Sequence, residues 1–480
     1  MKQNHIIQRV FVEITVNNKE KANRIKDDIN SFLSIDVFPE IEKYIHDIEY
    51  QLAGHILQIP RLELNLDVKN SALTPELKDK IAQLFKEKLS EIAKPGNTPE
   101  QETENEIQSH LIDHQEKTAE TFIYFLENGC MPWWNSDNEY TGFLETAVFE
   151  TILSTANFRK KVISILPKQH VQDRVIHQLS DEQISKLCLT ILENKELEIN
   201  LEIDSIRRIS QLNHHNRIMV WRLVLQVLSE YVNSSNCNLQ EYLLQQILKA
   251  KPAVLPKAKD KHEHWKTVVE IFPFIKEKEI LESIKNNITD HPESLKTADE
   301  TFDQNNAAVH DDVVLNDGQY IKNAGLILIH PFIKIFFEHC SLLHPETMEL
   351  TDPELAAHLL HYIATGKTNA PEYDMAFEKF LCNIPMNQTI NRHIKLSRKH
   401  KRQAKNVIES VQHNWGPMKN SSAALLQNEF FQRPGKLVVT DYDYTLTIER
   451  KTQDILLEKL AWGMGLVKLP WKEKFIFVNW

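Results

Sequence analysis

Two aspartates near the C-terminus are the residues of this chain whose type and spacing come closest to a reaction centre. In KLVVTDYDYTLT, residues 436–447, an apolar run leads into Asp441, and Asp443 and a threonine follow at alternate positions. Closely spaced carboxylates can act as a nucleophile and as a general acid. The chemistry to be weighed at this segment is therefore nucleophilic or acid–base catalysis.

The Asp-x-Asp-x-Thr pattern resembles the first motif of haloacid dehalogenase-type phosphatases. The resemblance implies phosphoryl transfer, with Asp441 as the phosphoryl-accepting nucleophile, Asp443 as the general acid and Mg²⁺ neutralising the phosphate. In those enzymes the motif ends the first strand of a doubly wound sheet, and the lysine and second acidic pair come from later strands. Only 37 of the 480 residues follow Asp443, too few for those elements. The alternative is a hairpin of Leu437–Val439 and Tyr444–Ile448, joined through Thr440–Asp443. We expect this antiparallel hairpin, whereas the phosphatase hypothesis requires a parallel sheet leading into Asp441.

A metal site is the second chemistry to consider. Glu354, His358 and His361 are spaced i, i+4 and i+7, so they share one face of a predicted helix, as metal ligands can. No fourth ligand is apparent and no H-E-x-x-H occurs, and histidines among apolar neighbours are more often packing residues. The five cysteines are far apart and include no C-x-x-C pair. The sequence predicts no metal, no cofactor and no catalytic residue, which favours a structural or interaction protein.

The composition also favours a structural or interaction protein. With 56 Lys+Arg against 67 Asp+Glu the formal charge is -11, so a general polyanion-binding role is disfavoured. The basic cluster at residues 395–402 reads as a solvated helix face. Glycine is scarce, 11 in 480, which argues against phosphate-cradling loops and toward helices. The N-terminus has no signal-peptide pattern, and the longest apolar run, 324–337, is too short to span a membrane. We expect a soluble protein that binds no nucleic acid and does not insert into membranes.

The patterns predict a mainly α protein with α+β ends. Residues 1–94 read as strand–helix–helix–strand–helix, with strands at 5–16 and 59–67, and residues 95–115 as a linker. Residues 116–250 form an irregular helical block, with a capping box at Ser180–Gln183 and a buried helix at 218–231. Residues 251–312 are linker-rich with short helices. Residues 313–480 read as a C-terminal α+β domain with antiparallel hairpins, and three of its predicted helices cover 326–337, 354–365 and 397–415.

Several segments, in order along nearly the whole chain, resemble the contractile injection system tape measure proteins of bacteria. The strand-like IPRLELNLD at 59–67 is similar to the family's I-x-R-L-E-L-D-L-G, with Val68 in place of the glycine. FLENGCMPWW at 125–134 is similar to FL-x-x-G-x-L-P-W-W, and NAGLILIHPF at 323–332 to N-A-G-L-V-L-L-x-P-F. HLLHYIATG at 358–366, KFLCNIP at 379–385 with Asn383 in place of a glycine, LPW at 469–471 and VNW at 478–480 complete the set.

The resemblance implies a non-enzymatic assembly component of a phage-tail-like injection particle, a tape measure or length-setting scaffold for the inner tube. It implies inner tube, baseplate or tube-terminating proteins as partners. It also implies a place in the bacterial cytoplasm during assembly and possible retention in the released particle. A cytosolic assembly chaperone or a baseplate-end assembly factor is the alternative.

Interface or structural anchors are sought among large amphipathic side chains and among residues that shape helix starts. Local core packing is the competing explanation for the tryptophans. The candidates are Trp133, Trp134, Asn323, Gly325, Pro331, Trp471 and Trp480.

Overall fold

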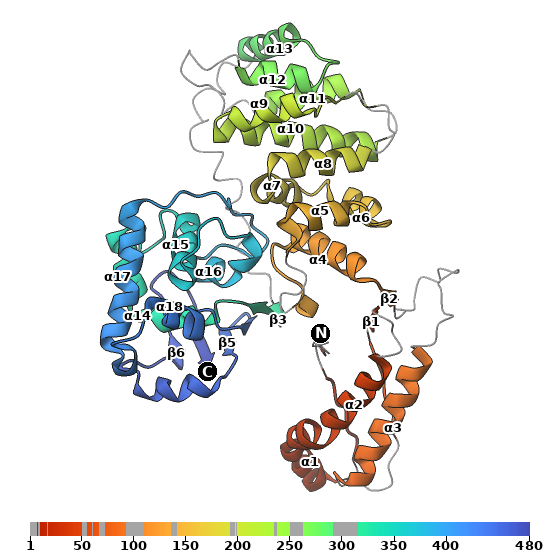
Figure 1. Cartoon of the computed structure of the whole chain (residues 1–480), viewed down its shortest axis with the longest axis vertical. Helices are drawn as coiled ribbons and strands as arrows, with labels where there is room; N and C mark the ends of the chain where they lie inside the picture. Colours follow the sequence, from red (N-terminus) through yellow and green to blue (C-terminus); the bar gives the residue numbers. More distant parts are fainter. Residues whose placement is uncertain are drawn as a thin grey trace. The chain divides into compact units, whose positions relative to one another are not determined.

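The chain divides into two compact units, Met1–Ala119 and Glu120–Trp480 (Figure 1). The structure, a computed structural model, describes residues 7, 10–16, 18–49, 55–59, 61–66, 73–92, 110–135, 142–192, 197, 199–234, 238–249, 263–290 and 315–480. As predicted, the protein is mainly helical with an α+β region at the C-terminus, and the sheet of that region is mixed.

Helices dominate the first unit. α1 (Lys19–Phe32) is capped by the Asn18 side chain, which accepts a hydrogen bond from the Glu20 backbone N–H. The π-helix η1 (Leu33–Val37) carries the chain without a break into α2 (Phe38–Glu49), and α3 (Pro75–Ile92) packs against both. Their shared apolar faces form the core of the unit: Phe32, Val37, Ile41, Ile48, Phe85 and Leu89. The three predicted helices of residues 1–94 are confirmed.

The two strands predicted for this unit, at 5–16 and 59–67, are wrong for the residues that the structure describes. Residues 10–16 and 61–66 pair with no described strand, and residues 5, 6, 8, 9, 60 and 67 lie outside the described residues. The only described strands of the unit are β1 (Ile56–Gln58) and β2 (His110–Ile112), an antiparallel pair. Alternating apolar residues permit a strand, but a strand also needs a partner edge. Leu62 and Leu64 instead pack against the helical core. β2 lies inside the predicted 95–115 linker, so His110–Ile112 pair with β1 rather than only linking two domains, and residues 95–109 lie outside the described residues.

The second unit begins with a succession of helices stacked side by side, drawn from orange to green in Figure 1. After α4 come short helices whose neighbours in sequence are mostly neighbours in space. Their bounds are α4 (His114–Asn128), α5 (Thr146–Leu153), α6 (Phe158–Ile165), α7 (Gln169–Gln178), α8 (Asp181–Leu192), α9 (Ile203–Gln211), α10 (His214–Asn233), α11 (Leu239–Lys249), α12 (Glu263–Ile271) and α13 (Glu277–Asp290).

Helix α10 is the centre of this helical array. It packs against α7, α8, α11 and α12, and Trp221 at its middle is fully buried, as the sequence predicts for residues 218–231. The predicted capping box is also present, because Ser180 N–H donates to Gln183 Oε1 at 3.0 Å and Gln183 N–H to Ser180 Oγ at 3.2 Å. Both contacts lie within the first turn of α8, so this signal for the helix start is local in sequence.

The C-terminal domain, residues 315–480, surrounds one large apolar core. The 3₁₀-helix η7 (Ala324–Ile329) leads into α14 (His330–His339), and α15 (Pro353–Thr365) ends at Gly366, whose φ of 69° is the expected left-handed C-terminal cap. The 3₁₀ turn η8 (Glu372–Asp374) precedes α16 (Ala376–Leu381). The later helices are α17 (Arg398–Asn414), α18 (Ala423–Leu426), the π-helix η10 (Gln427–Phe431) and the 3₁₀-helix η11 (Thr452–Lys459).

A five-stranded mixed sheet, with strand order β3-β4-β5-β7-β6, closes this core. The strands are β3 (Leu315–Ile321), β4 (Gly435–Val439), β5 (Tyr444–Ile448), β6 (Leu466–Val467) and β7 (Ile476–Asn479). β4 and β5 form the predicted antiparallel hairpin, with Val439 opposite Tyr444. β5 and β7 pair in parallel. The sequence analysis predicted only antiparallel hairpins in this region, so this pairing was not predicted.

The five-segment division of the sequence stays a prediction. The predicted boundary at 115/116 and the observed boundary at 119/120 both fall within α4. α12 and α13, from the predicted linker-rich segment, pack on α9 and α11 and so extend the helical array.

Candidate functional site

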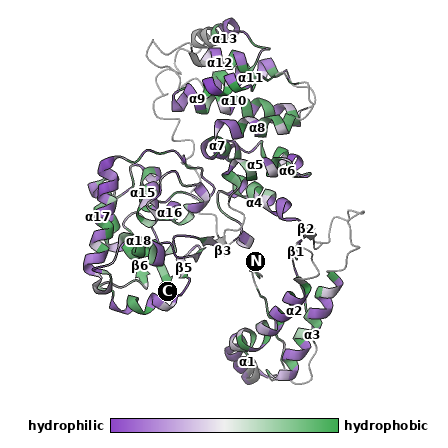
Figure 2. Cartoon of the chain, viewed as in Figure 1, coloured by the Kyte–Doolittle hydropathy of each residue, from purple (hydrophilic) through white to green (hydrophobic). Residues whose placement is uncertain are grey.

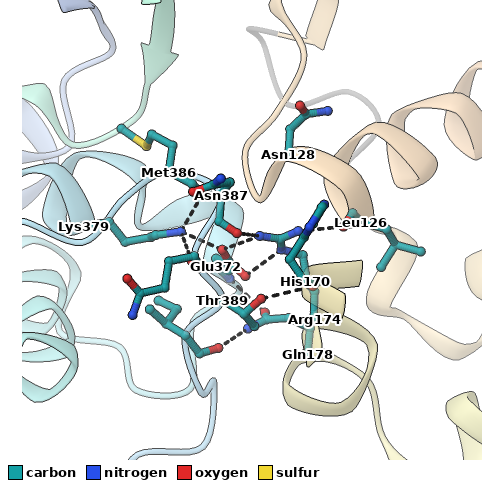
Figure 3. A network of polar contacts seen from close by, with 12 residues as sticks. Leu126, Asn128, His170, Arg174, Gln178, Glu372, Lys379, Met386, Asn387 and Thr389 are labelled. Atoms are coloured by element: carbon teal, nitrogen blue, oxygen red, sulfur yellow. Dashed lines mark hydrogen bonds and ion pairs between the residues drawn. The ribbon is translucent and has the colours of Figure 1, made fainter. Parts of the chain in front are cut away.

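Three charged side chains with no solvent exposure meet where the helical array joins the C-terminal domain (Figure 3). Arg174 of α7 binds Glu372 of η8 with two hydrogen bonds, Nε to Oε2 at 3.0 Å and Nη2 to Oε1 at 3.3 Å. Lys379 of α16 donates from Nζ to the same Oε1 at 2.7 Å. One carboxylate is therefore shared by two cations, and we call these three residues the ionic joint.

Backbone carbonyl groups complete the surroundings of the two cations. Arg174 Nη1 donates to the Leu126 carbonyl at 2.6 Å and Nη2 to the Asn387 carbonyl at 2.7 Å. Lys379 Nζ donates to the carbonyls of Met386 and Gln388 at 2.7 and 2.6 Å. The ionic joint thus ties α4 and α7 of the array to η8, α16 and the loop 385–390 of the C-terminal domain.

Gln178 adds a neutral link across the same boundary. Its Oε1 accepts the Glu372 backbone N–H at 2.9 Å, and its Nε2 donates to the Ile390 carbonyl at 2.8 Å. Beside it, Thr389 Oγ1 donates to the His170 carbonyl at 3.3 Å. Arg174 and Gln178 of the array are therefore hydrogen-bonded to groups of the C-terminal domain, which makes the relative placement of array and domain specific.

Gly129 is the residue that lets α4 approach the ionic joint. It ends α4 with φ 74°, in the left-handed region that favours glycine. A Cβ there would lie 2.6 Å from Glu372 Oε1 and 2.7 Å from both Arg174 Nη2 and the Met386 carbonyl oxygen. Both the backbone conformation and the space therefore require glycine at this position.

A second buried polar group lies on the C-terminal side. Glu378 of α16 is fully buried, and its Oε1 accepts from Asn323 Nδ2 at 2.7 Å and lies 2.8 Å from His361 Nδ1. Asn323 also donates to the Asp374 carbonyl at 3.3 Å. This arrangement holds the start of η7 against α15 and α16, which gives a structural reason for an asparagine at position 323.

Burial controls the ionisation of several groups around these clusters. Burial lowers the pKa of the Lys379 ammonium, and the Glu372 carboxylate offsets only part of that effect. Burial raises the pKa of Glu354 to about 7 and lowers the pKa of His358 to about 4. Burial also raises the pKa of the Cys130 thiol to about 11, so at neutral pH this thiol is protonated and a poor nucleophile.

The residues considered for metal binding are used in packing and hydrogen bonding. His358 Nε2 lies 2.8 Å from the Asn391 carbonyl, Glu354 Oε1 accepts the Asn391 backbone N–H, and His361 pairs with Glu378. Among the residues that the structure describes, no three His, Cys, Asp or Glu side chains are arranged to hold a metal ion.

The two aspartates considered for phosphoryl transfer lie at the tip of the β4–β5 hairpin. Asp441 is exposed, and Asp443 accepts a hydrogen bond from Thr440 Oγ1 at 2.9 Å inside the turn. The strand that leads into Asp441 pairs antiparallel with both of its neighbours. The hairpin prediction is confirmed, and the sheet order that the phosphatase hypothesis requires is not found.

The first candidate anchors lie just after α4. Trp133 and Trp134 form the 3₁₀ turn η2 (Trp133–Asn135) and pack edge to face, 5.7 Å between ring centroids. Trp134 also packs edge to face on Tyr124 at 5.5 Å. Both are partly buried in this local aromatic cluster. Whether they contact another protein stays a prediction.

The anchors of the C-terminal domain are also held by contacts within the chain. A Cβ on Gly325 would lie 1.7 Å from the Phe430 carbonyl oxygen, and Pro331 occupies the first turn of α14. Trp471 Nε1 donates to the Leu381 carbonyl at 2.7 Å, and Trp480 Nε1 donates to Asp454 Oδ2 at 3.1 Å. These contacts account for structural roles, and an interface role for these residues stays a prediction.

Of the segments that carry the family resemblance, FLENGCMPWW and KFLCNIP reach the ionic joint through Leu126 and Lys379, and a family comparison covers the whole set. The profile of the contractile injection system tape measure proteins matches residues 4–480. The chain belongs to this family. Comparison with curated proteins and with solved structures found no significant match. Within the described residues of this tape measure family member, no helix is long and apolar enough to cross a membrane.

One departure of this tape measure family member from the usual motif has a clear structural basis. Asn383 stands where the family pattern usually has glycine, and its φ is 57°. Asparagine is among the few side chains that adopt this region readily. It also gains contacts that glycine lacks, because Nδ2 donates to the Trp471 carbonyl at 2.6 Å and Oδ1 accepts from Lys472 Nζ at 2.9 Å. Two family segments are thereby joined. Val68, the other departure, lies outside the described residues.

Sequence reasoning did not find the ionic joint. Arg174 and Glu372 are 198 positions apart, and each lies in a stretch with no motif of its own. One local signal was available: Gly129 is a rare glycine in a glycine-poor chain and the glycine of the FLENGCMPWW segment. A glycine between a helix and a Pro-Trp-Trp turn indicates close approach of other groups, although not which groups approach.

Proposed function

We propose that this protein sets inner-tube length in a bacterial contractile injection particle as a folded body bound at an end of the tube. Its partners are then inner tube, baseplate or tube-terminating proteins, met in the bacterial cytoplasm during assembly. The family match supports a role as a tape measure. The fold supports the more specific statement, that the chain works folded rather than stretched along the tube.

The observation that carries this proposal is the ionic joint. A ruler must be extended, and a continuous helix of 480 residues would reach about 720 Å. The longest described helix, α10, has 20 residues and so spans about 30 Å. Stretching the chain would separate Arg174 from Glu372 and would also expose the apolar core of the C-terminal domain. No sustained heptad pattern offers a coiled coil that would replace those contacts.

The experiment compares particle length in strains that carry altered copies of the gene. One variant inserts about 60 residues of helix-forming sequence at 297–312, a stretch that the sequence predicts to be a linker. A second duplicates part of residues 116–250. A ruler would lengthen the tube by about 90 Å for a helical insert of that size. The folded-body proposal expects tubes of unchanged length with the insert, measured by electron microscopy of purified particles.

A variant that disrupts the folded body supplies the complementary arm. Glu372→Gln removes the carboxylate of the ionic joint and is expected to give few particles or tubes of uncontrolled length. Glu150→Gln, in an exposed pair with Lys186, is the matched control and should assemble normally. Tube length that follows residue number would overturn the folded-body proposal in favour of a ruler. Absence of the protein from purified particles would favour the cytosolic assembly chaperone.

A further inference from the structure

The outer face of α17 carries a row of cations without partners. Lys395, just before the helix, and Arg398, Lys399 and Arg402 are exposed, and none of the four makes an ion pair or hydrogen bond with any described residue. We call these four residues the basic stripe. Figure 2 shows α17 as one of the most hydrophilic helices of the C-terminal domain.

The stripe differs from the other charged surfaces of its unit. In the helical array, several exposed cations are paired with acids on neighbouring elements, as in Lys161–Glu120 at 3.0 Å, Lys186–Glu150 and Arg208–Glu270. The exposed lysines of the array that lack a described partner, such as Lys160 and Lys266, are far apart in the sequence rather than clustered. Residues 395–405 contain six lysines and arginines and no acid, in a chain with a formal charge of -11. A solvated helix face normally mixes both signs, so this segregation calls for another explanation.

The basic stripe lies at the N-terminal end of α17, where positive charge lowers the stability of the helix. The first turn of α17 has no acidic residue, and its cations face the positive end of the helix dipole. The helix is instead held by its cap and its buried side. Ser397 Oγ accepts the His400 N–H at 3.1 Å, while Ala404, Val407 and Val411 are buried. A charge pattern that opposes local stability on a well-anchored helix is typical of a binding surface.

We propose that the basic stripe docks an acidic surface of another protein of the injection particle. This inference rests on the proposed function, because that function makes the partner a protein of the particle. The cations of the basic stripe then indicate that the partner's surface is acidic. Cations at helical spacing lie about 6 Å apart, which suits a row of glutamates on a partner helix. Electrostatic complementarity of this kind sets encounter rate and register.

A nucleic acid is the weaker match for this surface. The helical part of the stripe, residues 398–402, covers about 6 Å of helix axis, and Lys395 lies just before it, so the stripe can reach only a few phosphates. The exposed positions at 395–406 include no aromatic side chain on which a base could stack. The overall negative charge of the chain also repels a long polyanion.

The test compares two quadruple variants of the full chain. The stripe variant is K395Q/R398Q/K399Q/R402Q. Removing cations from the first turn of a helix relieves the dipole, so thermal stability should not fall. The control neutralises the same number of exposed lysines that lack a described partner elsewhere in the unit: Lys160, Lys266, Lys278 and Lys459.

The first readout is binding to defined probes. A glutamate-rich helical peptide and a single-stranded oligothymidylate of equal charge are compared by fluorescence anisotropy at two salt concentrations. We expect the stripe variant to bind the peptide about tenfold more weakly than the control variant. Equal binding by the two variants overturns the proposal. Tighter binding of the oligonucleotide than of the peptide overturns it in favour of a nucleic acid.

The second readout uses purified particles. A carbodiimide joins a lysine amine directly to a contacting carboxylate, so we expect Lys395 or Lys399 to be joined to an Asp or Glu of another particle protein. Failure of this cross-link, with normal amounts of the stripe variant in particles, overturns the docking inference and leaves the folded-body proposal intact. Absence of the wild-type protein from particles would instead contradict the proposed function.

Discussion

Replacing Glu372 by glutamine is the most informative single perturbation of this fold. The substitution keeps the shape of the side chain but removes the only negative charge of the ionic joint. Arg174 and Lys379, which lie 3.0 and 2.7 Å from the carboxylate, would then be two fully buried cations without a counter-ion. Removing one partner of a buried ion pair typically costs about 3–5 kcal/mol. We expect a loss of that size in the free energy of unfolding.

Replacing Lys379 by methionine should cost less, although it removes three hydrogen bonds. Lys379 is fully buried, and this burial lowers the pKa of its ammonium group even beside the Glu372 carboxylate. Methionine removes the buried ammonium charge. Arg174 and Glu372 then remain as a doubly hydrogen-bonded pair with no net charge. The carbonyls of Met386 and Gln388 lose a donor, so the net loss should be about 1–2 kcal/mol.

Urea-induced unfolding followed by far-ultraviolet circular dichroism measures both variants. Glu150→Gln makes the same chemical change in a pair whose side chains are 42% and 54% exposed, and it should cost under about 1 kcal/mol. The reasoning is refuted if Lys379→Met destabilises the protein as much as Glu372→Gln. It is also refuted if Glu372→Gln unfolds no more easily than the Glu150→Gln control.

Three further perturbations test other parts of the structure. Gly129→Ala should destabilise by more than about 2 kcal/mol, because its left-handed φ of 74° and the 2.6 Å approach to Glu372 Oε1 both oppose a Cβ. Gly325→Ala, whose Cβ would lie 1.7 Å from a backbone carbonyl oxygen, should prevent folding of the C-terminal domain, whereas Gly463→Ala, with nothing within 4 Å, should leave urea unfolding unchanged. The folded-state pKa of His358, about 4, lies below the usual 6.5, so its stabilisation is present above pH 6.5 and is lost as the pH falls toward 4. The wild type should lose about 2 kcal/mol more than His358→Gln between pH 7 and pH 5 in urea titrations.

Elements set by neighbouring residues were predictable from the sequence. The Ser180–Gln183 capping box and the Gly366 cap depend on contacts within one turn, and both are present as predicted. The β4–β5 hairpin has a short turn and clear alternation on both sides, so its pairing was also predictable. In each case the partners are close in sequence, which makes a local pattern sufficient.

Elements that depend on distant partners were not predictable. Residues 10–16 alternate as a strand should, yet no strand in the described part of the chain pairs with them, because alternation says nothing about where a partner edge lies. The parallel pairing of β5 with β7 joins Tyr444 to Ile476 through the fold of the whole C-terminal domain. The ionic joint was missed for the same reason, since a buried arginine and a buried glutamate look like surface residues until tertiary structure brings them together.

The ionic joint and the basic stripe suggest a division of labour within this tape measure family member. Arg174, Glu372 and Lys379 are wholly buried and offer nothing to a partner, so they fix the geometry between the helical array and the C-terminal domain. Lys399 and Arg402 are exposed and offer nothing to the fold, because they have no partner within the described chain. A stretched chain would use neither the ionic joint nor the basic stripe. Extension would separate the residues of the joint and would remove the fixed spacing of the cations in the stripe. A folded body uses both: the joint holds the C-terminal domain at a set position, and the stripe on that domain then presents its cations to an acidic partner in one orientation.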